Sequence, residues 1–156
     1  MKKFLSYILV ICLIIPCAFF MVACGNNDEG SDIDNAVVIS YGEEGWYMEG
    51  RTSIDGYKGQ TYYFQFSTEM NVAPSKIIVY RAVQEDPTTL STEPLASSEY
   101  SIIIYNHNKI KQDWHLDENH VITDAQSNAK ALEYGTIYYV AIKLNVDAFL
   151  GLRLEK

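Results

Sequence analysis

Residues 132–142 read LEYGTIYYVAI, and the second half of this stretch decides the fold class. Tyr138, Val140 and Ile142 occupy alternate positions in it. A period of two places their side chains on one face of an extended chain, which is the pattern of a half-buried β-strand. The stretch therefore predicts a strand over residues 136–144 with its apolar face toward a core.

The same alternation recurs along the chain. It is clearest in TYYFQFS, where Tyr62, Phe64 and Phe66 share one parity. Further strands are predicted at residues 35–41, 45–50, 61–67, 75–83, 99–105 and 149–156. No internal segment shows a sustained helical period. Seven to eight short strands without intervening helices predict an all-β fold, with a sandwich as the expected architecture.

Residues 99–116 are interpreted as a β-hairpin. The strand EYSIIIY is followed by NHN, and Asn is a favoured turn residue because it tolerates positive φ. On the far side of the turn, Ile110, Trp114 and Leu116 fall on one parity. The pattern therefore predicts a second strand that returns beside the first, with these three side chains in the core.

The stretch around residue 138 resembles the entry to strand F of fibronectin type III and related immunoglobulin-like domains. Leu132, Gly135 and Tyr138 stand at the matching positions. The resemblance implies an antiparallel β-sandwich in which the tyrosine ring is buried and its hydroxyl bonds backbone a few residues upstream, a tyrosine corner. These three residues are accordingly predicted to be structural.

A second, shorter resemblance is to bacterial surface immunoglobulin-like domains. These often carry a strand that ends in Phe-Ser-x-x-Met-Asn, and residues 66–71 match it. The TYYF and GTIYYVAI strands suit equally well the jelly-roll modules appended to secreted proteases. The family of the sandwich stays open between these alternatives.

The first 24 residues have the layout of a secretory signal peptide. Lys2 and Lys3 precede a long apolar stretch, which small Ala23 closes. MVAC, residues 21–24, resembles the lipobox of bacterial lipoproteins, in which the cysteine is acylated and the chain is cut just before it. The resemblance implies lipid attachment at Cys24 and an extracytoplasmic protein anchored to a bacterial membrane.

This layout predicts the domain organisation. Residues 1–23 are the signal peptide, residues 24–34 are the lipidated cysteine with a flexible acidic tether, and residues 35–156 are the β-sandwich domain. An uncleaved transmembrane anchor and an ordinary signal peptide remain as alternatives, because the apolar stretch is nearly long enough to span a bilayer.

The net charge limits the kinds of binding partner, and the cysteine positions limit the thiol chemistry of the exported domain. After removal of residues 1–23, ten Lys and Arg face twenty Asp and Glu, a net charge of −10. Nucleic acid is not expected as a partner, because phosphate binding needs a basic face. Cys12 and Cys17 lie in the segment to be removed, so an acylated Cys24 leaves the exported domain without a free thiol or a disulfide.

The sequence offers no catalytic constellation. His115 and His120 lie near Asp113, Asp117 and Asp124, but they lack the spacing of a helical zinc site or a calcium loop. No serine occupies a nucleophile elbow, and no glycine-rich phosphate loop occurs. We therefore predict a protein that is not an enzyme and has no metal site and no cofactor.

Aromatic residues are the remaining candidates for ligand contact. Trp46 shares its parity with Met48, which favours the core, as does the parity of Trp114. Tyr63 and Tyr139 lie opposite core-facing neighbours and are the predicted ligand-binding residues, with ordinary cross-strand packing as the alternative. The expected function is a non-catalytic binding or interaction module for a protein or glycan. The alternatives are a carbohydrate-binding module and an accessory subunit of an envelope assembly.

Overall fold

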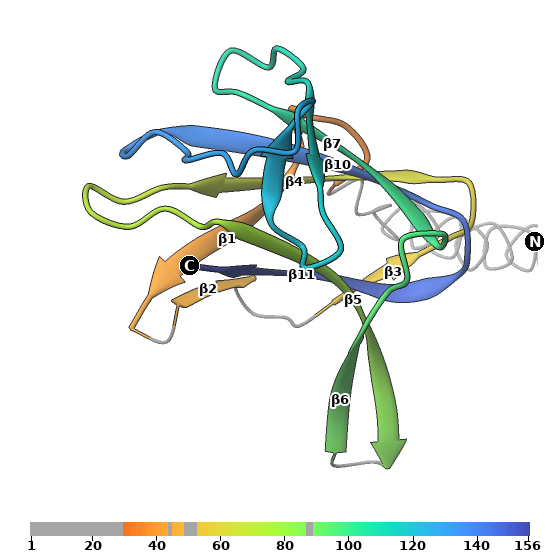
Figure 1. Ribbon diagram of the computed structural model, residues 1–156. Coiled ribbons are helices and arrows are strands. Elements are labelled where there is room, and N and C mark those ends of the chain that lie inside the picture. The colour runs from red at the N-terminus through yellow and green to blue at the C-terminus, as the bar shows by residue number, and fades with distance from the viewer. Residues whose placement is uncertain (1–29, 44, 49–52, 87–88) are drawn as a thin grey trace, which may run out of the picture.

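The computed structural model describes residues 30–43, 45–48, 53–86 and 89–156 (Figure 1). This part of the chain forms eleven strands and no helix, which confirms the all-β prediction. The strands are β1 (Val37–Gly42), β2 (Gly45–Met48), β3 (Ile54–Gly56), β4 (Thr61–Ser67), β5 (Lys76–Asp86), β6 (Thr89–Pro94), β7 (Tyr100–Tyr105), β8 (Trp114–Leu116), β9 (Ile122–Asp124), β10 (Ile137–Leu144) and β11 (Ala148–Glu155).

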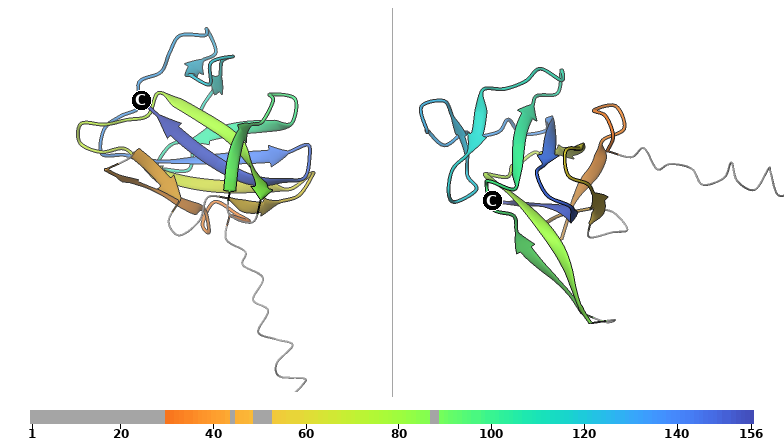
Figure 2. Two further views of the ribbon diagram at one scale, coloured as in Figure 1. Left: turned by 90° about the horizontal axis from the view of Figure 1, so that it is seen from below. Right: turned by 90° about the vertical axis from the view of Figure 1, so that its right-hand side faces the viewer.

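Two sheets pack face to face as a β-sandwich. The first has the strand order β2-β1-β4-β10-β7 and the second the order β3-β11-β5-β6, while β8 and β9 form a separate two-stranded sheet. Figures 1 and 2 show the long strands of the two sheets as separate layers. The β5–β6 hairpin extends beyond the rest of the domain at the bottom of Figure 1.

The core lies between the two sheets, as the alternation predicts. Phe64 and Phe66 of β4 are fully buried, and so are Val140 and Ile142 of the neighbouring β10. The second sheet contributes buried side chains at alternate positions of two strands, namely Ile77, Val79, Leu150, Leu152 and Leu154. Removing this apolar surface from water is the main favourable term in the stability of the domain.

One strand pair departs from the antiparallel pattern that was expected. β1 and β2 form an antiparallel hairpin, but β1 runs parallel to β4 on its other side. Between β2 and β4 the chain passes through β3, which belongs to the second sheet. β4 therefore runs parallel to β1 and antiparallel to β2, although all three strands lie in one sheet.

The predicted hairpin over residues 99–116 forms only beside its turn, where Tyr105 pairs antiparallel with Lys111 and the N–H of Gln112 donates to the carbonyl of Ile104 at 2.8 Å. The predicted second strand does not continue along β7. β7 pairs with β10, and β8 pairs with β9. The Asn106 side chain accepts the backbone N–H groups of Asn108 and Ile110, both at 3.0 Å, and thereby closes a loop after β7. Ile110 is 59% exposed in this loop. Trp114 and Leu116 do pack against the core, but from the two-stranded sheet.

The chain joins the sandwich at Gly30, before the predicted end of the tether. The carbonyl of Gly30 accepts the N–H of Tyr63 in β4 at 2.8 Å. The Asp34 carboxylate forms an ion pair with Lys109. Residues 30–34, which the sequence assigns to the tether, therefore contact the domain through both backbone and side chain.

Candidate functional site

The predicted corner residues lie together at the entry to β10. Gly135 has a φ of 64°, a left-handed conformation that favours glycine. The N–H of Glu133 donates to the Tyr138 hydroxyl at 3.0 Å, and the Tyr138 ring and Leu132 are both buried. Burial raises the pKa of Tyr138, and the hydrogen bond from Glu133 opposes this. The burial and the backbone bond are those that the spacing predicts.

Thr68 stabilises the same corner, a role that the sequence pattern does not predict. It is a buried polar residue that follows β4. Its hydroxyl donates to the carbonyl of Glu133 at 2.6 Å and accepts the N–H of Thr136 at 2.9 Å. One side chain thereby satisfies backbone groups on both sides of Gly135, which a single sequence gives no signal for. The corner is a structural device that holds the turn into β10.

Tyr63 and Tyr139 lie on the outward face of the five-stranded sheet, as their parity predicts. Tyr139 is opposite Tyr105 of β7, and Tyr63 is opposite Ala141 of β10. Both tyrosines are half-buried. Ala141 is only 3% exposed although it shares their outward face, which means that neighbouring side chains cover it. The two rings belong to a packed aromatic face, and ligand binding by them stays a prediction.

The acidic stretch around residues 113–124 uses carboxylates to hold turns. Asp117 Oδ1 accepts the N–H groups of Asn119 and Val121, and Asp124 Oδ1 accepts those of Gln126 and Asn128. Within the described ranges, no three His, Cys, Asp or Glu side chains are grouped so that they could hold a metal ion. That no metal or cofactor binds stays a prediction.

The predicted lipid-attachment residue, Cys24, lies outside the described residues, and so does the whole signal segment 1–23. Among the residues that are described, no helix is long and apolar enough to cross a membrane.

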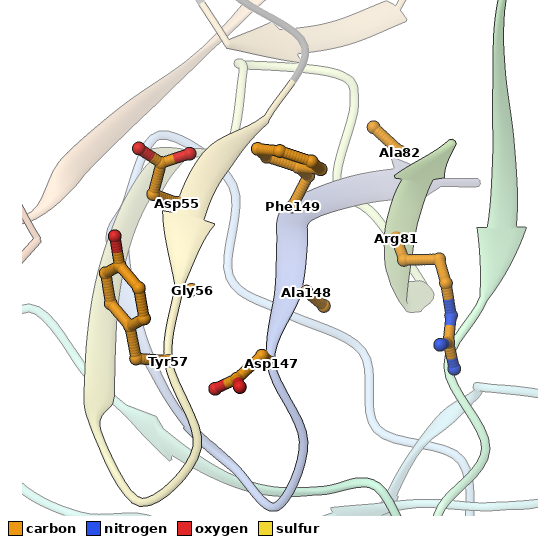
Figure 3. A pocket seen from close by; sticks show the side chains of 8 residues that line it. All are labelled: Asp55, Gly56, Tyr57, Arg81, Ala82, Asp147, Ala148 and Phe149. Atoms are coloured by element: carbon orange, nitrogen blue, oxygen red, sulfur yellow. The ribbon is translucent and has the colours of Figure 1, made fainter. Parts of the chain in front are cut away.

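A cleft of about 630 Å³ opens at a place that the sequence analysis did not single out. It lies in the second sheet, where β5 and β11 separate (Figure 3). The register between them ends at the pair Leu150–Arg81. Beyond it, β11 pairs with β3, whereas β5 continues to Asp86 in pairing with β6. Eight residues line the cleft, namely Asp55, Gly56, Tyr57, Arg81, Ala82, Asp147, Ala148 and Phe149.

The β3–β11 side of the cleft alternates aromatic and acidic residues. Phe149 is directly opposite Asp55 across the two strands, so their side chains share one face. Tyr57 is two residues after Asp55, and Asp147 is two residues before Phe149, so both have the same parity as their neighbours. Tyr57 and Phe149 are 60% and 57% exposed. Two exposed rings in a concave setting are a common feature of ligand sites.

Backbone contacts fix this side of the cleft. Asp147 Oδ1 accepts the N–H of Lys58 at 2.7 Å, and the N–H of Tyr57 donates to the Tyr62 hydroxyl at 2.9 Å. Gly56 lies between them, and a Cβ there would lie 2.5 Å from a methyl group of Leu144 and 2.8 Å from the carbonyl oxygen of Ala148. Only glycine fits so close an approach without a shift of the neighbouring backbone.

The charge of the cleft is negative. Arg81 Nη2 donates to Glu99 Oε1 at 2.5 Å, and this bond lowers the pKa of Glu99. The guanidinium charge is thus balanced by a carboxylate outside the lining. Neither Asp55 nor Asp147 has an ion-pair partner in the described part of the chain. The uncompensated charge at the cleft comes from these two carboxylates.

The cleft residues give a weak signal in the sequence. Asp55 and Tyr57 belong to or follow a three-residue strand, which is too short to show alternation. Phe149 and Asp147 are about 90 residues away and meet them only through strand register. The alternation in FLGLRLEK does predict that Phe149 points away from the core, and this outward position was the one available indication.

No family model, no curated protein and no solved structure matches the chain. The sandwich, the cleft and the N-terminal sequence are therefore the observations that bear on function.

Proposed function

We propose that this protein is a bacterial lipoprotein, anchored through acylated Cys24, which holds a non-catalytic binding domain outside the cytoplasm. The observation that carries the proposal is the order of features along the chain. A charged and apolar leader ends in MVAC, an acidic segment follows, and the chain then enters a β-sandwich at Gly30. Two or more acyl chains on one cysteine give stable anchoring, because each buried methylene adds about 0.8 kcal/mol.

The sandwich is proposed to be immunoglobulin-like. The hydrogen bond from Glu133 to the Tyr138 hydroxyl supports this, since immunoglobulin-like domains fix the turn into strand F in the same way. Such domains are common scaffolds for recognition, but the fold alone does not define a ligand.

The binding role is proposed to belong to the cleft between β5 and β11. Its volume of about 630 Å³ falls within the range typical of ligand sites, roughly 300–1,000 Å³. Exposed rings and carboxylates are also what a sugar ring would contact, so a carbohydrate-binding module remains the second candidate. Tyr57, Phe149 and the two aspartates favour it more than Tyr63 and Tyr139 do.

Anchoring is tested by labelling cells with radioactive palmitate. The unaltered protein is expected to carry label and to sediment with membranes. Cys24→Ser should lose the label and either leave the membrane fraction or accumulate uncut. Cys17→Ser changes the same residue type within the leader and should keep both label and location. Unchanged labelling of Cys24→Ser would refute the lipoprotein assignment.

A further inference from the structure

We infer that the cleft binds an extended, basic peptide segment of a partner protein by strand addition to the open edge of β5. The inference rests on the proposed function in taking the cleft as the binding site. It adds the chemical class of the ligand and the way in which the backbone recognises it.

The first observation is an edge of β5 that faces the cleft. Leu95 donates to the carbonyl of Val79 at 2.9 Å, which directs the backbone groups of Val79 toward the β6 side. Because these groups alternate along a strand, Ala82 and Gln84 direct theirs toward β11. From Ala82 onward, no other strand of the described chain pairs with that side of β5. Such an edge is a template for an added strand.

The second observation is the shape of the opening. Arg81 and Ala82 of β5 stand on one side of it, and Ala148 and Phe149 of β11 stand on the other (Figure 3). The opening borders the edge of β5, and a chain that is added to this edge is itself extended. The exposed rings of Phe149 and Tyr57 then offer apolar contact to alternate side chains of that chain.

The third observation is charge. Asp55 and Asp147 lie in the lining without ion-pair partners, and the whole chain carries a net charge of −8. Carboxylates beside aromatic rings favour Lys or Arg side chains, through ion pairs and cation–π contacts. The same negative charge opposes pairing of this edge with a second copy of the chain, since two like-charged surfaces would meet.

The test uses the full chain, purified in detergent, against a phage-displayed library of random dodecapeptides. Selection should recover peptides that alternate β-branched or aromatic residues with Lys or Arg. A recovered peptide is then synthesised in two forms, each N-methylated at every second amide. The form that loses the amides facing β5 should lose binding by about a hundredfold, and the other should stay within about threefold, because only alternate amides bond one neighbour.

Matched variants locate the peptide on the protein. Tyr57→Ala and Phe149→Ala should each weaken binding about tenfold or more, as buried aromatic anchors do. Tyr134→Ala is the control, because Tyr134 is 62% exposed but lies outside the cleft. Asp55→Asn and Asp147→Asn should weaken binding and reduce its salt dependence, whereas Asp113→Asn should do neither. All of these side chains are exposed, so the fold is expected to persist.

Recovery of no basic peptide would overturn the inference, and so would equal effects of the two N-methylated forms. Binding that survives Tyr57→Ala and Phe149→Ala but is lost in Tyr139→Ala would place the ligand on the other sheet and would also overturn it. Displacement of the peptide by free chitin or cellulose oligosaccharides, with tighter binding of the sugar, would favour the carbohydrate reading instead. None of these results alters palmitate labelling, so failure of the inference stays distinguishable from failure of the anchoring proposal.

Discussion

Tyr138 and Tyr139 are neighbours in β10, yet the sandwich uses them in different ways. Tyr138 points inward, its ring centroid 5.8 Å from that of Phe66 and 6.1 Å from that of Trp114. Its hydroxyl oxygen accepts a hydrogen bond from the N–H of Glu133. Tyr139 points outward, and Lys109 Nζ lies 5.4 Å from the centroid of its ring. The pair therefore allows the corner to be tested with one chemical change on each face of a single strand.

Tyr138→Phe should lower the free energy of unfolding by about 1–3 kcal/mol, because it leaves the N–H of Glu133 without its partner in a part-buried site. Tyr139→Phe should change it by less than about 0.5 kcal/mol, as most surface changes do. Urea denaturation of residues 30–156, the range that contains the whole core described above, measures both. A larger loss for Tyr139→Phe would contradict the structural role assigned to the corner.

At the scale of elements, a tyrosine of β5 packs closely over a glycine of β11. Gly151 is directly opposite Tyr80, and the tyrosine ring covers it. A Cβ on Gly151 would lie 2.1 Å from Cζ of that ring. Tyr80 is buried, so the ring has little room to move aside.

Gly151→Ala is expected to destabilise the domain by about 1–3 kcal/mol, the usual cost of overpacking. In a Tyr80→Ala background the same substitution should cost much less, because the ring that it would meet is gone. A double-mutant cycle by urea denaturation gives the coupling between the two positions. Additive effects in that cycle would show that the strain does not come from the ring.

Asp124 provides a test of the turn that follows β9. Hydrogen bonds from the backbone of Asn128 and Gln126 lower its pKa below 3.8. A carboxyl whose pKa falls on folding stabilises the folded state above its unfolded pKa and loses that contribution as the pH falls through the folded value. Asn at this position keeps the oxygen acceptor but does not titrate.

The urea midpoint should therefore fall less in Asp124→Asn than in the unaltered protein when the pH is lowered from 5 to about 3. Near pH 7 the unaltered protein should be the more stable of the two, because a charged carboxylate accepts these N–H groups more strongly than a neutral amide does, and the difference should shrink as the pH falls. Parallel curves for the two proteins throughout this pH range would remove Asp124 as a contributor to acid sensitivity.

Element by element, the sequence predicts strands with a long period-two pattern and fails for short ones. β4, β10 and the core face of β11 follow directly from alternation. β3, β8 and β9 have three residues each, which is too few to show a period. The pairing of β7 with β10 is long-range and has no local signal, whereas the hairpin expected from adjacency in sequence is limited to the bonds beside the Asn106 turn.

For the whole molecule, the candidate site depends on where strands separate, which is a property of register. The outward parity of Tyr63, Tyr139 and Phe149 can be predicted from sequence, but their surroundings cannot. Tyr63 and Tyr139 lie over a continuous sheet, where neighbours pack around them. Phe149 lies at the point where β5 leaves β11, so its ring borders open space. Exposure of an aromatic residue at such a point needs the long-range pairing to be known.

The hydrogen bond between Gly30 and Tyr63 also limits how far the domain can lie from the membrane. Five residues, 25–29, separate Cys24 from Gly30, the first residue that the structure describes. Even fully extended, the six steps from Cys24 to Gly30 span no more than about 22 Å. If Cys24 is acylated as proposed, Gly30 stays within that distance of the lipid headgroups. A partner then has to come within reach of a domain that is held at the membrane surface, and residues inserted between 25 and 29 should widen the accessible zone without altering affinity at the cleft.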